Sequence, residues 1–175
     1  MTITTNAREL ISHFTRYQNT FEQKMHDFAE TLAGYGIFIA KAEFRAADYS
    51  GTNDAEVSDA PVWVDDHTLQ IVASGESVMF IEFGAGTFYP DDHPAASANG
   101  AIRGAYGHGR GANPPWIYRG EKGVSDAEPV LDKNGNERDG LWWTRGNPAN
   151  KPMWNSAEEM RKNILDVARA VFMND

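Results

Sequence analysis

Two Asp-Asp-His triplets, at residues 65–67 and 91–93, contain the side chains of this sequence that are best suited to hold a metal ion. Carboxylate and imidazole groups are ligands for hard and borderline cations. Adjacent residues on a strand point to opposite faces, however, so one triplet cannot direct three ligands to a single ion. Turn-forming aspartates and solvated histidines explain both triplets better, and we expect neither a metal nor a cofactor.

The other residues of chemical interest lack the spacing of a catalytic motif. The glycine-rich segments 84–86 and 104–111 do not continue into Gly-Lys-Ser/Thr, and neither joins a strand to a helix as a phosphate loop does. Five histidines could supply a general base: His13, His26, His67, His93 and His108. No nucleophile elbow or metalloprotease spacing accompanies them. We therefore expect no catalytic activity; the alternative is a small metal-dependent hydrolase or nuclease that uses Asp and His in the 91–108 region.

Length, charge and cysteine content narrow the class of protein. A chain of 175 residues favours a single domain, 1–175. The net charge is −9, and residues 1–83 carry 13 acids against 5 bases. No basic stripe could neutralise nucleic-acid phosphates, so tight DNA binding is not expected. The absence of cysteine fits a reducing compartment, and no secretory signal or membrane span is visible.

A long amphipathic helix is predicted from residue 6 to about residue 33. Asn6 with Glu9 is typical of a helix start, and Gly34 and Gly36 are predicted to end the helix. His13 and His26 should lie partly buried beside its apolar stripe. The stripe has the spacing of one helix face and contains Leu10, Phe14, Tyr17, Phe21, Met25, Phe28 and Leu32.

After this helix the sequence favours short strands. Alternation over residues 38–45 predicts a half-buried strand. Runs at 61–64 and 68–73, separated by the turn-like residues 65–67, predict a hairpin. Residues 77–83 form an apolar run that is too short for its period to separate a strand from a helix.

Residues 85–140 form a long insertion, rich in glycine, which we expect to be more mobile than the rest. Within and just after it, Pro115–Gly120 and Leu141–Gly146 repeat one pattern, an aromatic cluster followed by Arg-Gly. We predict that these two segments pair as the strands of a projecting arm. A second amphipathic helix is predicted over about 153–172, with Pro152 as a possible first-turn residue. The fold class is therefore α+β: two helices packed on a small, mostly antiparallel sheet with a long glycine- and tryptophan-rich arm.

The aromatic residues of the arm have the composition of an interface. Aromatic and arginine side chains together are enriched where proteins bind one another, and stacking on single-stranded nucleic acid is the rival interpretation. The acidic balance of the chain disfavours that rival. The candidate contact residues are Trp116, Tyr118, Arg119, Trp142, Trp143 and Arg145.

Two short motifs give the chain a resemblance to a known family. The first is Ile81, Glu82, Phe83 and Gly84; the second is Pro152 and Met153, preceded by small residues and followed by a helix. With these motifs, and in the order of its elements over nearly the whole length, the chain resembles the tail-completion (neck, head–tail joining) family of long-tailed double-stranded DNA bacteriophages. The insertion between the two motifs is longer and richer in glycine and tryptophan than in compact members.

This resemblance implies a structural virion protein without an active site. It implies a homo-oligomeric ring, with six copies expected on assembly, that binds other phage connector and tail proteins. Tail completion, stopper and tail terminator all remain open as the exact role. The protein would be made in the host cytoplasm and end in the virion, and genome DNA would pass through the ring without tight binding. We expect some of a set of acidic residues to face the lumen, and a solvated face of the sheet is the alternative; the set is Glu43, Asp48, Asp54, Glu56, Asp59, Asp65 and Asp66.

Overall fold

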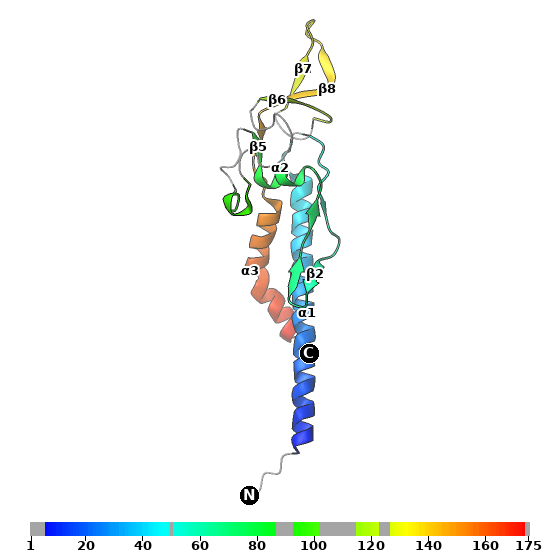
Figure 1. The fold of residues 1–175 in the computed structure, drawn as a ribbon, viewed down its shortest axis with the longest axis vertical. Coiled ribbons are helices and arrows are strands. Elements are labelled where there is room, and N and C mark those ends of the chain that lie inside the picture. The colour runs from blue at the N-terminus through cyan, green and yellow to red at the C-terminus, as the bar shows by residue number, and fades with distance from the viewer. Residues whose placement is uncertain (1–5, 50, 87–92, 102–114, 123–126, 174–175) are drawn as a thin grey trace.

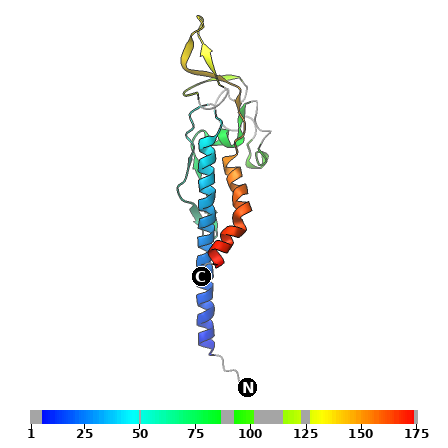
Figure 2. The same cartoon turned by 180° about the vertical axis from the view of Figure 1, so that it is seen from behind.

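The computed structural model describes residues 6–49, 51–86, 93–101, 115–122 and 127–173. One helix, α1 (Ala7–Ala46), runs through most of an elongated molecule, and α3 (Pro152–Met173) lies beside its C-terminal half (Figure 1). Seen from behind, the N-terminal half of α1 projects alone beyond the end of α3 (Figure 2). The class is α+β as predicted, although the described strands form four small sheets, all antiparallel, in place of one.

Helix α1 begins where the sequence predicts, but it ends at Ala46, 13 residues beyond the predicted end at about residue 33. The side chain of Asn6 caps its first turn by accepting a hydrogen bond from the Arg8 backbone N–H at 3.2 Å. The predicted stop at Gly34 and Gly36 is wrong, and so is the predicted strand over 38–45, because both segments are helical. A helical glycine costs only about 1 kcal/mol relative to alanine, which packing against a neighbouring helix can offset.

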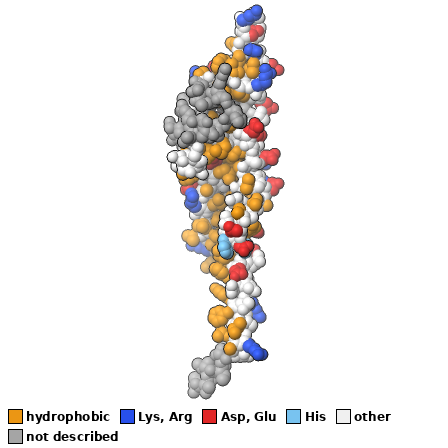
Figure 3. All heavy atoms as spheres, viewed as in Figure 1, with side chains coloured by type: hydrophobic (Ala, Val, Ile, Leu, Met, Phe, Trp, Pro, Cys, Tyr) orange, Lys and Arg blue, Asp and Glu red, His pale blue; other side chains and the backbone are white. Residues whose placement is uncertain are grey.

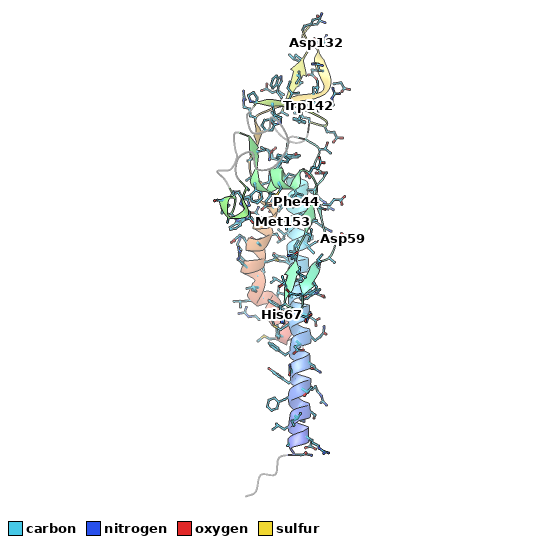
Figure 4. The ribbon with its side chains drawn as sticks, in the orientation of Figure 1. Phe44, Asp59, His67, Asp132, Trp142 and Met153 are labelled. Carbon is cyan, nitrogen blue, oxygen red and sulfur yellow. The ribbon has the colours of Figure 1, made fainter. Side chains whose placement is uncertain are left out.

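Helices α1 and α3 approach closely at Gly36. A Cβ atom at this position would lie 2.5 Å from Met160 Sδ and 2.7 Å from Ile71 Cδ1. The hydroxyl of Ser156, which is buried, donates to the Gly36 carbonyl oxygen at 2.8 Å. The two helices thus approach closely because a glycine and a serine face each other, and side chains such as Phe44 and Met153 fill the space above them (Figure 4).

Replacing each of the two glycines of α1 by alanine should change the stability of the fold in opposite directions. At Gly34 a Cβ meets nothing within 4 Å, so Gly34→Ala is expected to stabilise the fold by about 1 kcal/mol through helix propensity alone. At Gly36 the added methyl group displaces Met160 and Ile71, so Gly36→Ala should destabilise it by about 1–3 kcal/mol. Urea unfolding of both variants checks the pair. Equal effects at the two positions would contradict the close packing.

The predicted hairpin is confirmed and packs on the other side of α1. Strands β2 (Val62–Asp65) and β3 (Thr68–Gln70) pair around a turn in which Asp65 accepts the His67 backbone N–H at 2.8 Å. Trp63 stacks on His26 of α1 with ring centroids 4.6 Å apart, and its indole N–H donates to Glu30. Strands β1 (Glu56–Val57) and β4 (Ala73–Ser74) pair nearby, and Val57 joins the core.

The core lies where α1, β1 and the short helix α2 (Val78–Phe83) meet. The sequence could not decide between a strand and a helix for residues 77–83, and the structure shows that they are mostly helical. Beyond α2, strand β5 (Ala85–Gly86) pairs with β9 (Gly146–Asn147), and segment 93–101 contains a 3-10 turn, η1 (Ser97–Asn99). The buried residues of this core are Ile37, Ala40, Phe44, Ala47, Val57 and Ile81.

The predicted pairing of the two aromatic segments is confirmed. Strands β6 (Trp116–Arg119), β8 (Glu137–Thr144) and β7 (Glu128–Leu131) form an antiparallel sheet, the β-arm, in the order β6-β8-β7. At its tip Asp132 accepts the backbone N–H groups of Asn134 and Asn136 at 2.7 and 2.9 Å, while Trp142 lies near its base (Figure 4). The glycine-rich segment 104–111 and Asp91 and Asp92 lie outside the described residues.

Candidate functional site

A buried carboxylate joins the two segments that carry the family resemblance. Glu82, in the last turn of α2, is only 6% exposed. Its two oxygens accept the backbone N–H groups of Met153 and Trp154 at 2.8 and 3.0 Å, in the first turn of α3. The positive end of the helix dipole favours an anion at this place. Glu82 therefore caps α3 from 71 residues away in the sequence.

His93 completes the environment of this carboxylate. Its Nε2 lies 2.9 Å from Glu82 Oε1, and its Nδ1 accepts the Ala95 backbone N–H at 3.0 Å. Because Nδ1 is an acceptor, Nε2 must carry the proton that it donates to Glu82. The ring lies 4.5 Å from the Phe83 ring and 5.8 Å from the Trp154 ring. His93 thus links segment 93–101 to the start of α3. The histidine of the second Asp-Asp-His triplet, residues 91–93, therefore has a structural role.

A tightly packed crossing completes this joint between residues 81–86 and 145–156. Asn150 donates its backbone N–H to the Ile81 carbonyl oxygen at 2.9 Å and exchanges two side-chain hydrogen bonds with the Asp48 backbone. Gly84 has a φ of +79°, and a Cβ there would lie 2.8 Å from the Ala149 nitrogen. The structure thus brings together Ile81, Glu82, Phe83, Gly84, Pro152 and Met153, and their contacts are those of a fold-determining joint. Asn147 and Asn150 belong to it as well, and no sequence signal singled them out.

The remaining histidines do not assemble a catalytic group in the described part of the chain. His13 and His26 are exposed, which corrects the expectation that both are partly buried: the stripe beside His13 is uncovered, and His26 lies on the hairpin side of α1. His67 forms the β2–β3 turn, and His108 lies outside the described residues. Among described residues, no three His, Asp or Glu side chains gather as a metal site.

The proposed interface residues divide between the two faces of the β-arm. Trp116, Tyr118 and Trp142 are half-buried on one face, where the Trp142 indole N–H donates to the Gly120 carbonyl oxygen at 3.0 Å. Tyr118 donates to the Lys122 carbonyl oxygen at 2.7 Å. Burial, and then the charge of Tyr49, raises the pKa of Tyr118 to about 12, so the phenol keeps its proton at neutral pH.

The opposite face of the β-arm is open. Ile117 and Trp143 lie directly across from each other on β6 and β8 and are 44% and 41% exposed. Arg119 has the same register parity and is exposed, as is Arg145 just beyond β8. Trp143 with its neighbours is therefore available for a partner, whereas Trp116, Tyr118 and Trp142 mainly stabilise the arm.

The seven acidic residues lie on or near the C-terminal half of α1 and the first three strands. All are exposed except Glu43, which is half-buried and accepts a hydrogen bond from Asn155. Asp59 pairs with Lys41, which lowers the pKa of its carboxyl group, and it projects from the body (Figure 4). Acidic side chains gather along the edge of the body that faces away from α3 (Figure 3).

Asp54 has a structural role that a pH series can detect. The hydroxyl and backbone N–H of Ser77, and then the Glu76 N–H, hold the pKa of Asp54 below 3.8. A carboxyl pKa that is lowered in the folded state stabilises the fold above the unfolded pKa, and this stabilisation is lost as the pH falls through the folded-state value. Because this carboxylate is exposed and screened by solvent, Asp54→Asn should lower the free energy of unfolding by less than about 1 kcal/mol at pH 7, and by less still at pH 3, in urea unfolding. Asp66→Asn, at an exposed turn position, is the control.

A long run of exposed apolar side chains lies on the N-terminal part of α1, within the apolar stripe that the sequence predicts. The free stripe, residues 10–25, is uncovered because α3 ends beside Phe21: the Phe172 ring lies 5.9 Å from the Phe21 ring. Hydrophobic side chains line this projecting part of the helix on the side of α3 (Figure 3). The exposed members of the stripe are Leu10 (47%), Ile11 (64%), Phe14 (66%), Tyr17 (71%), Phe21 (48%) and Met25 (43%).

No helix in the described ranges has the length and hydrophobicity needed to cross a bilayer. No known protein family, no curated protein and no solved structure matches this chain.

Proposed function

We propose that this chain is a structural subunit of the head–tail junction of a tailed bacteriophage, where it acts by ring assembly and by binding neighbouring connector and tail proteins. Support for the family comes from the joint around Glu82. The two motifs that resemble the tail-completion family lie 71 residues apart and meet through the Met153 and Trp154 N–H groups. The residues of the two motifs cap a helix, pack in the core and form a tight turn. These are roles in folding, which is what the motifs of a structural protein are expected to have.

The uncovered apolar surface is the observation that carries the assembly role. It lies at both ends of the molecule: the free stripe on α1, and the open face of the β-arm with Ile117 and Trp143. Exposed apolar patches of this size mark interaction sites. The free stripe offers a contact between neighbouring copies, which closes into a ring when the rotation between copies allows it, and the β-arm offers a separate contact to a connector or tail protein.

The acidic edge fits a channel through which DNA slides. Carboxylates such as Asp48, Glu56 and Asp66 are exposed on the body, and each repels phosphate over about 8–10 Å at physiological salt. Under this proposal the isolated protein has no measurable affinity for duplex DNA near physiological salt. Micromolar binding that weakens steeply with added salt would contradict it.

The role can be tested in the phage genome that encodes the chain. Deleting its gene should leave filled heads and separate tails in electron micrographs, and supplying the wild-type chain from a plasmid should restore joined particles. A complementing copy with Ile117→Ser and Trp143→Ser tests the open face of the β-arm; a copy with Glu137→Ser and Asp139→Ser is the control, because both residues are exposed on β8 near the arm tip. Joined, infectious particles from the deletion strain would contradict the proposal.

A further inference from the structure

The free stripe on α1 continues a contact that already exists within the subunit. Phe172 of α3 packs against Phe21 and Phe28, with ring centroids 5.9 and 6.3 Å apart, and the Phe172 carbonyl oxygen accepts from Lys24 at 3.3 Å. The same helix face continues through Tyr17, Phe14 and Leu10 with no cover from the described chain. A helix packs on the C-terminal part of this face, and the N-terminal part presents the same kind of surface to solvent.

The spacing of the stripe matches that of helices that pack along one another. Leu10, Phe14, Tyr17 and Phe21 are separated by steps of four, three and four, which is the alternation of a heptad seam. Ile11 and Met25 both flank this seam on the same side and widen the apolar surface. A wider apolar surface allows one helix to contact two neighbouring helices, as in a larger bundle. The stripe is therefore broader than the seam of a two-stranded coil.

The flanks of the stripe favour a copy of the same helix as the partner. Between positions 11 and 20, the seam formed by Leu10, Phe14, Tyr17 and Phe21 is bordered by residues without a carboxylate, ammonium or guanidinium group: Ile11, His13, Gln18 and Thr20. Identical helices can therefore lie side by side in register without repulsion between fixed like charges. Lys24, further along the same face, is half-buried and donates to the Phe172 carbonyl oxygen within the subunit.

The available area is sufficient for a weak contact between neighbouring copies. A buried aromatic side chain covers about 150–250 Å², and the six members of the free stripe are 43–71% exposed. The stripe thus offers on the order of 600 Å² per copy. In a ring this area is divided between two neighbours, so each interface buries about 600 Å² in total, which is the size of a weak contact that adds to the other contacts of the assembly.

We propose that the N-terminal segments of α1, residues 10–25, pack against one another in parallel between neighbouring copies and form a helical collar on one side of the ring. This inference rests on the proposed ring assembly, because subunits related by rotation about one axis all point in the same direction. The partner is therefore the same segment of the next copy, at the same level. The β-arms, at the other end of each subunit, remain available for a different partner.

Charge placed in the stripe tests the contact. The double variant Phe14→Glu and Tyr17→Glu alters two side chains that are 66% and 71% exposed in the subunit, so its thermal melting should match that of the wild type. In sedimentation velocity at high protein concentration, the wild type should form oligomers and the variant should remain a monomer. Thr15→Glu with Asn19→Glu adds the same charge to exposed residues on the opposite face of α1 and should oligomerise like the wild type. Equal oligomerisation of all three proteins would overturn the collar.

Direction is tested by cross-linking, which the absence of native cysteine makes simple. Parallel packing places Leu10 near Leu10 of the next copy, so Leu10→Cys should give covalent dimers with a short bismaleimide. Antiparallel packing would place Leu10 near Met25, so that a mixture of Leu10→Cys and Met25→Cys proteins would cross-link while Leu10→Cys alone would not. Cross-linking of the mixture but not of Leu10→Cys alone would overturn the proposal. So would the absence of any cross-link in Leu10→Cys at the protein concentrations at which the wild type forms oligomers.

Failure of the collar can be separated from failure of the junction role. If the Phe14 and Tyr17 double variant still complements the gene deletion and still forms rings in micrographs, the collar is wrong and the junction role stands. If the gene deletion itself leaves joined particles, the junction role is wrong, whatever the cross-linking shows.

Discussion

Glu82→Gln is expected to lower the free energy of unfolding by about 3–5 kcal/mol, a large share of the total for a domain of this size. The carboxylate accepts three hydrogen bonds, from Met153 and Trp154 N–H and from His93 Nε2. Glutamine has the same shape, but one of its oxygens becomes an NH₂ group that cannot accept. A buried N–H donor would then face another donor and lose its partner. Urea unfolding followed by circular dichroism measures the loss.

The control for this experiment is Glu128→Gln, an exposed residue of β7, which should change the free energy of unfolding by less than about 0.5 kcal/mol. A second readout separates the cap from general destabilisation. Amide exchange of Met153 and Trp154 should accelerate more than exchange in the centre of α1. If Glu82→Gln unfolds at the wild-type urea concentration, the buried cap is not an important source of stability.

Gly146→Ala is expected to be about as damaging, with a loss of about 3–5 kcal/mol. Gly146 has a φ of +111°, a conformation that residues with a side chain rarely adopt. A Cβ atom there would lie 1.9 Å from the Ala85 carbonyl oxygen and 2.9 Å from the Gly86 Cα. Both contacts are with backbone, which no side-chain rotation can relieve. The β5–β9 pairing must therefore open, and with it the crossing that positions α3.

Gly135→Ala separates steric overlap from backbone strain. Gly135 also has a positive φ, of +84°, but a Cβ at this position in the tip of the β-arm meets nothing within 4 Å. It should lose only about 1–2 kcal/mol, the cost of a left-handed conformation for alanine. Thermal melting of the two variants side by side gives the comparison, and equal losses would argue against the close approach at Gly146.

The sequence predicts most of the elements but misassigns the C-terminal third of α1. The positions of Phe38, Ala40, Ala42 and Phe44 fit the period of a strand, while Ile37, Ala40 and Phe44 fit the spacing of a helix equally well. Glycines at 34 and 36 favour the first interpretation. The helix prevails because α3 packs against Gly36, and that contact joins residues 120 positions apart, which local patterns do not report.

The candidate surfaces were predictable only in part, for the same reason. The pairing of the aromatic segments follows from their repeated pattern, but the inward position of Trp142 and the outward position of Trp143 depend on which face of the β-arm is covered. The stripe on α1 is visible in the sequence as an apolar face. Its exposure is not, because that depends on where α3 ends, beside Phe21.

The order in which the chain is synthesised has a consequence for how it folds. Helix α1 is made first, yet the helix that covers its C-terminal half begins only at Pro152. Contacts of such long sequence separation form slowly, because a large loop must close before they contribute. During synthesis, the apolar faces of α1 around Phe28 and Phe44 therefore remain without the contacts that α3 provides until more than 100 further residues have been added. A slow final folding phase that follows the synthesis of α3 is the expected signature, and nascent chains truncated before residue 152 should aggregate or recruit chaperones.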